Sequence, residues 1–230
     1  MTGIILKFIA ILVIMQLLVI IAVCWKNFKQ IKKEALFIVL FSVLALLAQV
    51  VSTTLSWLKI NNIWVLHVYT AGEFVLLYLF YYQVLHLGEL KTRLNWPLLF
   101  LVAVFGFMVF SSIYIETING FNPMSRTLEC LILCGFSVFF YIKEIRAIAY
   151  FESYDPRREG LLLINTGILL LFSGQFFIYL MSNYMFYEMH NSQSRILWIF
   201  NGLLNLLFYS ILIVGIWKLA SPKKNFSGSY

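Results

Sequence analysis

Seven continuous apolar stretches make up most of the sequence, and each is long enough to cross a lipid bilayer as a helix. They occupy residues 3–25, 36–58, 64–87, 97–115, 127–151, 161–184 and 196–219. A hydrocarbon core of about 30 Å is crossed by about 20 helical residues. The stretches lack the alternation of apolar and polar residues that is typical of strands in a membrane barrel. We therefore expect an all-α membrane protein, a bundle of seven transmembrane helices.

The composition agrees with this fold class. The chain is 62% hydrophobic and 12% charged, whereas soluble domains are about half apolar and about a quarter charged. Its net charge of +7 comes from basic residues in short runs between the apolar stretches, without a single patch interleaved with aromatic rings. We expect membrane lipid and no nucleic acid as a partner. Residues 1–220 are predicted to form one domain, followed by a short polar tail at 221–230.

The positions of the lysines and arginines predict the orientation of the bundle. With the N-terminus outside, 13 of the 17 basic residues fall on the cytoplasmic side: Lys26, Lys29, Lys32, Lys33, Lys91, Arg93, Lys143, Arg146, Arg157, Arg158, Lys218, Lys223 and Lys224. Cytoplasmic loops of membrane proteins carry an excess of these residues. We therefore expect an outside N-terminus, a cytoplasmic C-terminus and a place in the cytoplasmic (inner) membrane of a bacterium.

Cysteine and histidine spacings predict neither a metal site nor a cofactor. The three cysteines, Cys24, Cys130 and Cys134, lie inside apolar stretches, where cysteine usually packs as a small hydrophobe. His67 and His86 are 19 residues apart on one predicted helix, or about 28 Å along its axis, too far to share an ion. His190 and Glu188 could approach His67, but so few ligands make a weak site.

A layer of polar residues at one depth is the main lead on function. Glu73 lies about nine residues into the third stretch, or ~13 Å from its outer boundary. Similar counts give about 13 to 17 Å for Gln49, Ser173, Gln175 and Asn205, which come from three other stretches. Ionisable groups in membrane spans are costly and usually functional, so Glu73 is the leading candidate.

Helical spacing gathers further polar residues toward this layer. Gln49, Ser52, Thr53 and Ser56 repeat at i, i+3, i+4 and i+7, while Tyr69 with Glu73 and Asn201 with Asn205 are i, i+4 pairs. His67, Tyr69, Thr70, Glu129 and Asn201 should lie nearer the outside. The candidate ligand-binding residues of this outer funnel are Glu73, Tyr69, His67, Gln49, Ser52, Ser173, Gln175, Asn201 and Asn205.

The two carboxylates are expected to be held differently. A carboxyl group in apolar surroundings needs a proton or a partner, and no lysine or arginine lies at the depth estimated for Glu73. We therefore expect Glu73 to be uncharged much of the time. Glu129 follows Arg126 by one turn near the surface, which predicts an ordinary interfacial ion pair.

The uncharged members of the layer have a second interpretation. Serine, threonine, asparagine and glutamine commonly join membrane helices by hydrogen bonds of about 0.6 to 2 kcal/mol each. Ligand binding and helix joining both remain open for them.

Several of these features resemble the membrane modules of bacterial seven-transmembrane sensor proteins of receptor type. They are the seven helices, the outside N-terminus, the glutamate of the third stretch and the run Trp198, Ile199, Phe200, Asn201, Gly202, Leu203, Leu204, Asn205. In that family the last helix usually leads into a cytoplasmic effector, whereas here only the tail follows. The resemblance therefore implies an output through a separate partner.

The predicted function is accordingly an integral membrane sensor or receptor-like protein that binds a small, partly apolar ligand. A proton-linked transporter or a subunit of a membrane transport complex is the first alternative, with Glu73 as the proton carrier. A structural membrane subunit is the second. An intramembrane lipid enzyme that uses His67, Glu73, Glu129 and His190 ranks last, because the sequence has no G-x-S-x-G motif or other recognised catalytic constellation.

Overall fold

The computed structural model of the chain is helical throughout its regular structure. It describes residues 2–27, 33–86, 96–115, 123–148, 156–181 and 191–220. The helices are α1 (Thr2–Lys26), α2 (Lys33–Trp57), α3 (Ile63–Val84), α4 (Trp96–Phe110), α5 (Pro123–Ile148), α6 (Pro156–Leu180) and α8 (Asn191–Ala220). A π-helical turn, η2 (Ser111–Ile115), continues α4. The prediction of an all-α fold is confirmed, and the described residues contain no strand.

Six of these helices are long and apolar enough to cross a membrane. They are α1, α2, α3, α4 with η2, α6 and α8. Helix α5 has 26 residues but carries Arg126 and Glu129 near one end and Lys143, Glu144 and Arg146 near the other. The uncharged run between Glu129 and Lys143 is therefore shorter than the ~20 residues of a typical span. The chain is an integral membrane protein, and a seventh crossing by α5 stays a prediction.

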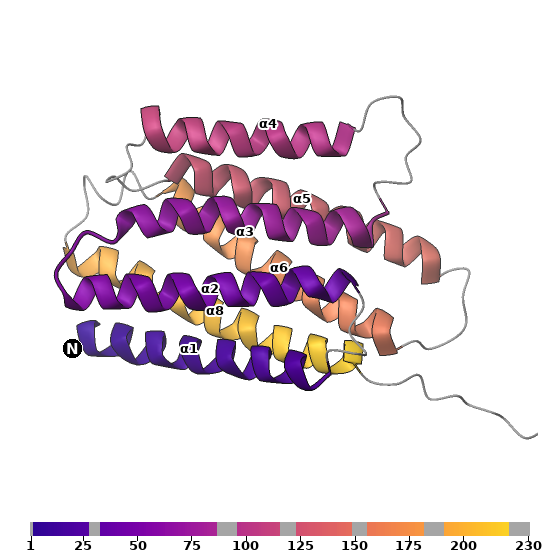
Figure 1. Cartoon of the computed structure of the whole chain (residues 1–230), viewed down its shortest axis with the longest axis horizontal. Helices are drawn as coiled ribbons and strands as arrows, with labels where there is room; N and C mark the ends of the chain where they lie inside the picture. Colours follow the sequence, from indigo (N-terminus) through magenta and orange to yellow (C-terminus); the bar gives the residue numbers. More distant parts are fainter. Residues whose placement is uncertain are drawn as a thin grey trace, which may run out of the picture.

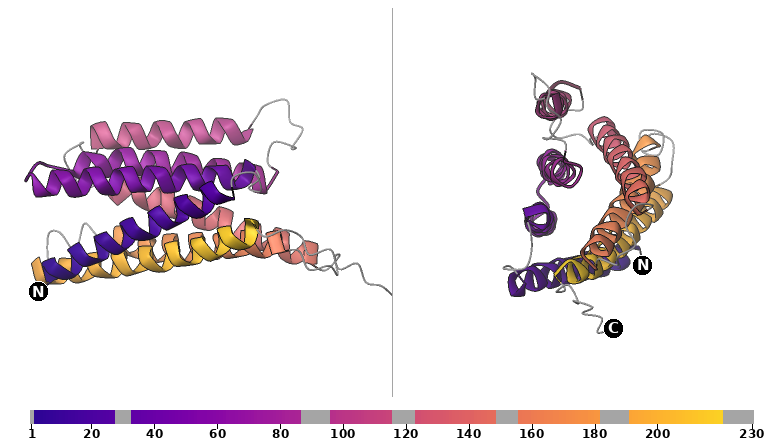
Figure 2. Two further views of the ribbon diagram at one scale, coloured as in Figure 1. Left: turned by 60° about the horizontal axis from the view of Figure 1, so that its bottom comes forward. Right: turned by 90° about the vertical axis from the view of Figure 1, so that its right-hand side faces the viewer.

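Six helices form a closed ring, and the seventh lies outside it. Helix α1 packs against α2 and α8, α2 against α3, α3 against α5, α5 against α6, and α6 against α8. Helix α4 packs on the outer side of α3, and η2 also touches α5. The end-on view in Figure 2 shows this arrangement, with α2, α3 and α4 in one row facing the curved row of α1, α8, α6 and α5.

The helices run roughly along one axis, with α5 and α6 oblique to α2, α3 and α4, so the bundle has two distinct ends (Figure 1). Helices α1, α3, α5 and α8 begin at the end on the left of Figure 1, which we call the N-terminal end. The other is the opposite end. Two ion pairs lie near the opposite end: Arg158 binds Glu144 between α6 and α5, and Lys218 binds Glu159 between α8 and α6.

Aromatic packing fills the ring toward the opposite end. Phe41 of α2 contacts Phe208 and Tyr209 of α8, with ring centroids 5.9 Å and 6.5 Å away. Phe136 of α5 stacks on Tyr81 of α3 at 5.7 Å. Full burial of such rings is a large source of packing energy.

One polar cluster lies within this aromatic part, and its groups bond one another. The Asn165 side-chain oxygen accepts hydrogen bonds from the Tyr81 hydroxyl at 2.8 Å and the Ser137 hydroxyl at 2.9 Å. The Asn165 amide nitrogen donates to the Ser137 carbonyl at 3.2 Å. These residues therefore join α3, α5 and α6 here.

Helices α6 and α8 approach each other most closely where both carry glycine. A Cβ atom placed on Gly160 would lie 2.7 Å from the Gly215 carbonyl oxygen and 2.7 Å from the Leu219 nitrogen. Real Cβ atoms essentially never come that close to another atom, and here the neighbours are backbone. Small residues permit this kind of backbone approach between membrane helices.

The observed helices match the predicted stretches apart from their ends. Helices α6 and α8 each begin five residues earlier than predicted, at Pro156 and Asn191, because amphipathic first turns extend both beyond their apolar cores. Residues 87, 149–151 and 182–184 of the predicted stretches lie outside the described residues, as do Glu188, His190 and the predicted tail at 221–230.

Candidate functional site

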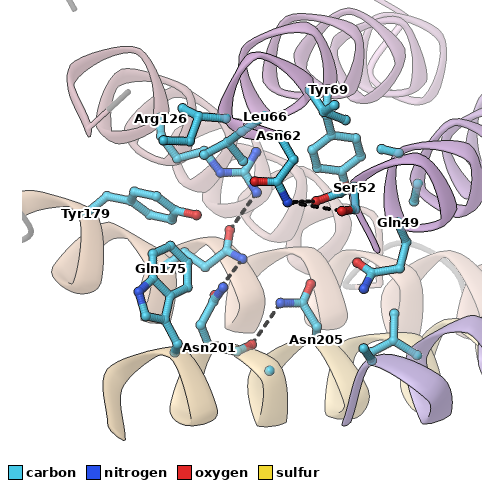
Figure 3. Close-up of a pocket in the computed structure, with 18 of the residues that line it drawn as sticks. Gln49, Ser52, Asn62, Leu66, Tyr69, Arg126, Gln175, Tyr179, Asn201 and Asn205 are labelled. Atoms are coloured by element: carbon cyan, nitrogen blue, oxygen red, sulfur yellow. Dashed lines mark hydrogen bonds between the residues drawn. The ribbon is translucent and has the colours of Figure 1, made fainter. Parts of the chain in front are cut away.

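A cavity of about 1160 Å³ lies inside the ring, in the half nearer the N-terminal end. All six ring helices contribute to its lining. The apolar wall includes Leu6, Ile9, Val13 and Leu17 of α1 and Ala45 and Ala48 of α2. The polar lining includes Gln49, Ser52, Asn62, Tyr69, Arg126, Gln175, Tyr179, Asn201, Asn205 and Tyr209. Figure 3 shows most of these side chains converging from α2, α3, α5, α6 and α8. The cavity thus joins an apolar wall to a cluster of hydrogen-bonding groups.

Arg126 is the centre of the polar cluster. Its side chain is 3% exposed and reaches inward from the first turn of α5. Its Nη1 donates to Glu73 of α3 and, at 2.6 Å, to Oε2 of Glu129. Its Nη2 donates to Oε1 of Gln175 on α6 at 2.9 Å. Arg126 therefore ties three helices together at one point.

Two expectations for the carboxylates are wrong. Glu73 does have a cationic partner, because the long side chain of Arg126 extends from the helix end to the depth of Glu73. The pair between Arg126 and Glu129 exists, yet it is buried and not interfacial, with Glu129 fully enclosed. One guanidinium thus faces two carboxyl groups, so the three carry a net charge of −1 if both are ionised and zero if one holds a proton.

Aromatic rings surround the guanidinium. The Arg126 Cζ atom lies 5.7 Å from the ring centroid of Tyr69 and 5.6 Å from those of Phe172 and Tyr179. A guanidinium within about 6 Å of an aromatic face is attracted by its quadrupole. These contacts help to offset the cost of burying the charge away from water.

A chain of hydrogen bonds continues from this cluster across the ring. The Tyr69 hydroxyl donates to Oε1 of Glu73 at 2.9 Å. On the other side of Arg126, Nε2 of Gln175 donates to Oδ1 of Asn201 at 2.9 Å. Side chains of α3, α5, α6 and α8 are therefore connected in sequence along the edge of the cavity. Figure 3 shows the part of this chain that runs from Arg126 through Gln175 to Asn201.

Replacing Tyr69 with phenylalanine should lower the free energy of unfolding by about 1.5–3 kcal/mol, the range for a hydrogen bond to a charged group. The change removes only the hydroxyl that donates to Glu73. Titration with SDS in mixed micelles measures the effect. Tyr82→Phe on the same helix is the matched control, because its hydroxyl makes no hydrogen bond with the described residues. Equal losses in both variants would contradict the assignment.

Six of the nine predicted ligand-binding residues line the cavity: Gln49, Ser52, Tyr69, Gln175, Asn201 and Asn205. The other three do not. Glu73 is fully buried behind Tyr69 and Arg126, to which both its oxygens are bonded. His67 turns toward η2, where its Nδ1 lies 2.9 Å from the Ser112 hydroxyl. Ser173 donates to the Leu170 carbonyl of its own helix at 3.2 Å.

Sequence reasoning missed Arg126 and Asn62 as cavity residues. Arg126 was placed by the depth of its Cα atom, which ignores a side chain long enough to reach inward along the helix. Asn62 lies just before α3, between two predicted stretches, and its amide donates to the Ser52 hydroxyl at 2.8 Å. The i, i+3 spacing of Arg126 and Glu129 was the available signal for a charged cluster.

The described residues contain no group of three or more His, Cys, Asp or Glu side chains able to hold a metal ion. The three cysteines are unpaired, and Cys24 and Cys130 are buried. The chemistry available around the cavity is therefore hydrogen bonding, apolar contact and the charge of one neutralised guanidinium.

Comparison with known proteins leaves this description of the site as it stands. No protein-family model matches the chain, and neither does a curated protein or a solved structure.

Proposed function

We propose that the chain is an integral membrane receptor-like protein that binds a small, partly apolar molecule in the ring cavity and acts through a partner protein. The observation that carries this proposal is the cavity itself, with an apolar wall on α1 and α2 and convergent polar groups opposite. Ligand sites typically enclose about 300–1000 Å³ and combine mostly apolar walls with a few polar groups. The cavity is slightly larger than that range and has the same character.

The proposed topology has seven spans, with the N-terminal end outside and the C-terminus in the cytoplasm of a bacterium. Of the described basic residues, Lys143, Arg146, Arg157, Arg158 and Lys218 all lie toward the opposite end of the bundle. The excess of basic residues expected on the cytoplasmic side supports this orientation. In it, the cavity belongs to the outer half of the membrane, and the partner would meet the basic inner end.

The test is whether a molecule co-purifies with the protein and depends on the cavity. Small molecules extracted from protein purified in its native membrane lipids are identified by mass spectrometry. We expect at least one compound to be enriched with the unmodified chain and lost in Ala48→Phe, which fills the cavity. Ala103→Phe adds the same ring to an exposed site on α4 and should keep the compound. A compound retained by both variants, or no enriched compound, would contradict the proposal.

Proton-linked transport is the second candidate, because Glu73 and Glu129 are two buried carboxyl groups that share one guanidinium. Against it, the polar groups of Asn165, Ser137 and Tyr81 toward the opposite end are bonded to one another. Proteoliposomes with an imposed pH gradient distinguish the two. Proton-driven uptake that Glu129→Gln abolishes would favour transport over ligand binding.

A further inference from the structure

The charge and hydrogen-bonding capacity of the cavity narrow the class of molecule that it takes. This step rests on the proposed function. We infer that the ligand is an uncharged amphiphile, with an apolar chain and one hydroxyl or amide head group. Long-chain alcohols, long-chain amides and monoacylglycerols have this chemistry.

The electrostatic surroundings disfavour an anion. Arg126 is the single charged side chain among the described residues that line the cavity. Its guanidinium already binds two carboxyl groups, so the cluster offers no net positive charge. Transferring an anion from water into such a site has a large desolvation cost that no cation would offset.

A cation is also poorly matched. Neither Glu73 nor Glu129 lines the cavity, and both are fully buried and bonded to Arg126. The charged group that does line the cavity is the guanidinium of Arg126, which repels an ammonium group. The Nε group of Arg126, which is buried without a hydrogen-bond partner among the described residues, offers a donor and no acceptor. An uncharged head group avoids both penalties.

The polar lining contains both hydrogen-bond donors and hydrogen-bond acceptors that make no bond with the described residues. The Gln49 amide makes no hydrogen bond with the described residues, and Figure 3 shows it pointing from α2 into the cavity toward α8. On α8, the Asn201 amide uses its oxygen for Gln175, and the Asn205 amide uses its nitrogen for the Asn201 carbonyl. This leaves the Asn201 nitrogen and the Asn205 oxygen available. A hydroxyl or amide, which both donates and accepts, satisfies such a pair.

The apolar part of the ligand has a wall to contact. Leu6, Ile9, Val13 and Leu17 line the cavity from successive turns of α1, and Ala45 faces it from α2. Leu6 and Leu17 are eleven residues apart, or about 16 Å along the helix. An extended alkyl chain lies along such a wall with favourable burial of its methylene groups.

The test uses four probes with the same dodecyl chain: the alcohol, the primary amide, the carboxylate and the trimethylammonium. The full chain is reconstituted in phosphatidylcholine nanodiscs, and its thermal midpoint is followed as each probe is added. We expect the alcohol and the amide to raise the midpoint. Gln49→Leu should weaken their apparent affinity about five-fold, the equivalent of one hydrogen bond. Thr54→Val, whose hydroxyl bonds only the Val50 carbonyl of its own helix, should leave it unchanged.

Each other outcome contradicts a different part of the inference: the charge of the ligand, the site of its head group or the class of ligand as a whole. A shift with the carboxylate or the trimethylammonium that Ala48→Phe abolishes would refute the charge class and leave the proposed function intact. A shift with the alcohol that Gln49→Leu does not weaken would refute the assigned head-group site. If no probe shifts the thermal midpoint in a way that depends on Ala48 or Gln49, the inferred class of ligand is wrong. The proposed function is then still decided by the co-purification experiment.

Discussion

Replacing Arg126 with glutamine is expected to lower the free energy of unfolding by about 3–5 kcal/mol, the usual cost of removing one partner from a buried ion pair. The reason is the arrangement around the guanidinium, which binds Glu73, Glu129 and Gln175 with 3% of the side chain exposed. Without the cation, two carboxyl groups face each other in a site away from water. SDS titration in mixed micelles, or thermal unfolding in nanodiscs, measures the loss.

Two further variants separate this explanation from a general effect of losing charge. Arg158→Gln breaks the ion pair with Glu144, whose side chains are 23% and 19% exposed, and should cost much less. Glu129→Gln leaves Arg126 paired with the single carboxylate of Glu73, which gives the pair a net charge of zero. This loss should therefore be smaller than that of Arg126→Gln. Similar destabilisation by Arg126→Gln and Arg158→Gln would show that the buried cluster contributes no more to the free energy of unfolding than a partly exposed ion pair.

The second large effect is expected at the contact between α6 and α8. Gly160→Ala should destabilise the protein by about 1–3 kcal/mol or more, the range for overpacking a tight interior. The added Cβ would collide with the Gly215 carbonyl and the Leu219 nitrogen, both 2.7 Å away. Because these are backbone atoms, the two helices must separate to make room.

Gly135→Ala is the matched control for this prediction. Gly135 lies on α5, and a Cβ atom there would have no heavy atom within 4 Å. Alanine is favoured over glycine in helices by up to ~1 kcal/mol, so the control should be neutral or slightly stabilising. A Gly160→Ala variant that unfolds under the same conditions as the unmodified chain would refute the close contact.

The helices could be predicted from the sequence because membrane spans require long, continuous apolar runs. The residues that face one another could be predicted only in part. Glu73 and His67 were assigned to one polar funnel. They are six positions apart on one helix, so their side chains point in directions that differ by about 120° and reach different neighbours. Glu73 meets Arg126 inside the ring, whereas His67 meets Ser112 outside it.

Arg126 shows the main limit of arguments from depth. Its backbone position near the helix end suggested the membrane interface, and its own flexible side chain overrode that suggestion. The depth of a long side chain depends on the groups that it bonds. For Arg126 these groups are Glu73 of α3 and Gln175 of α6, which are far away in the sequence. No pattern within α5 specifies them. For the six cavity residues that were predicted, a count along their own helices was enough, and no partner on another helix had to be known.

The seam between α3 and α5 has a mechanical consequence. It is the least extensive helix contact in the ring, and Phe136 with its aromatic neighbours holds only the part toward the opposite end. Nearer the N-terminal end, the two helices are joined by Glu73 and Arg126. At this end the ion pair acts together with the apolar contact of Leu128 and Ile132 with the cluster around Phe74, so breaking the pair should let the ring open first along this seam.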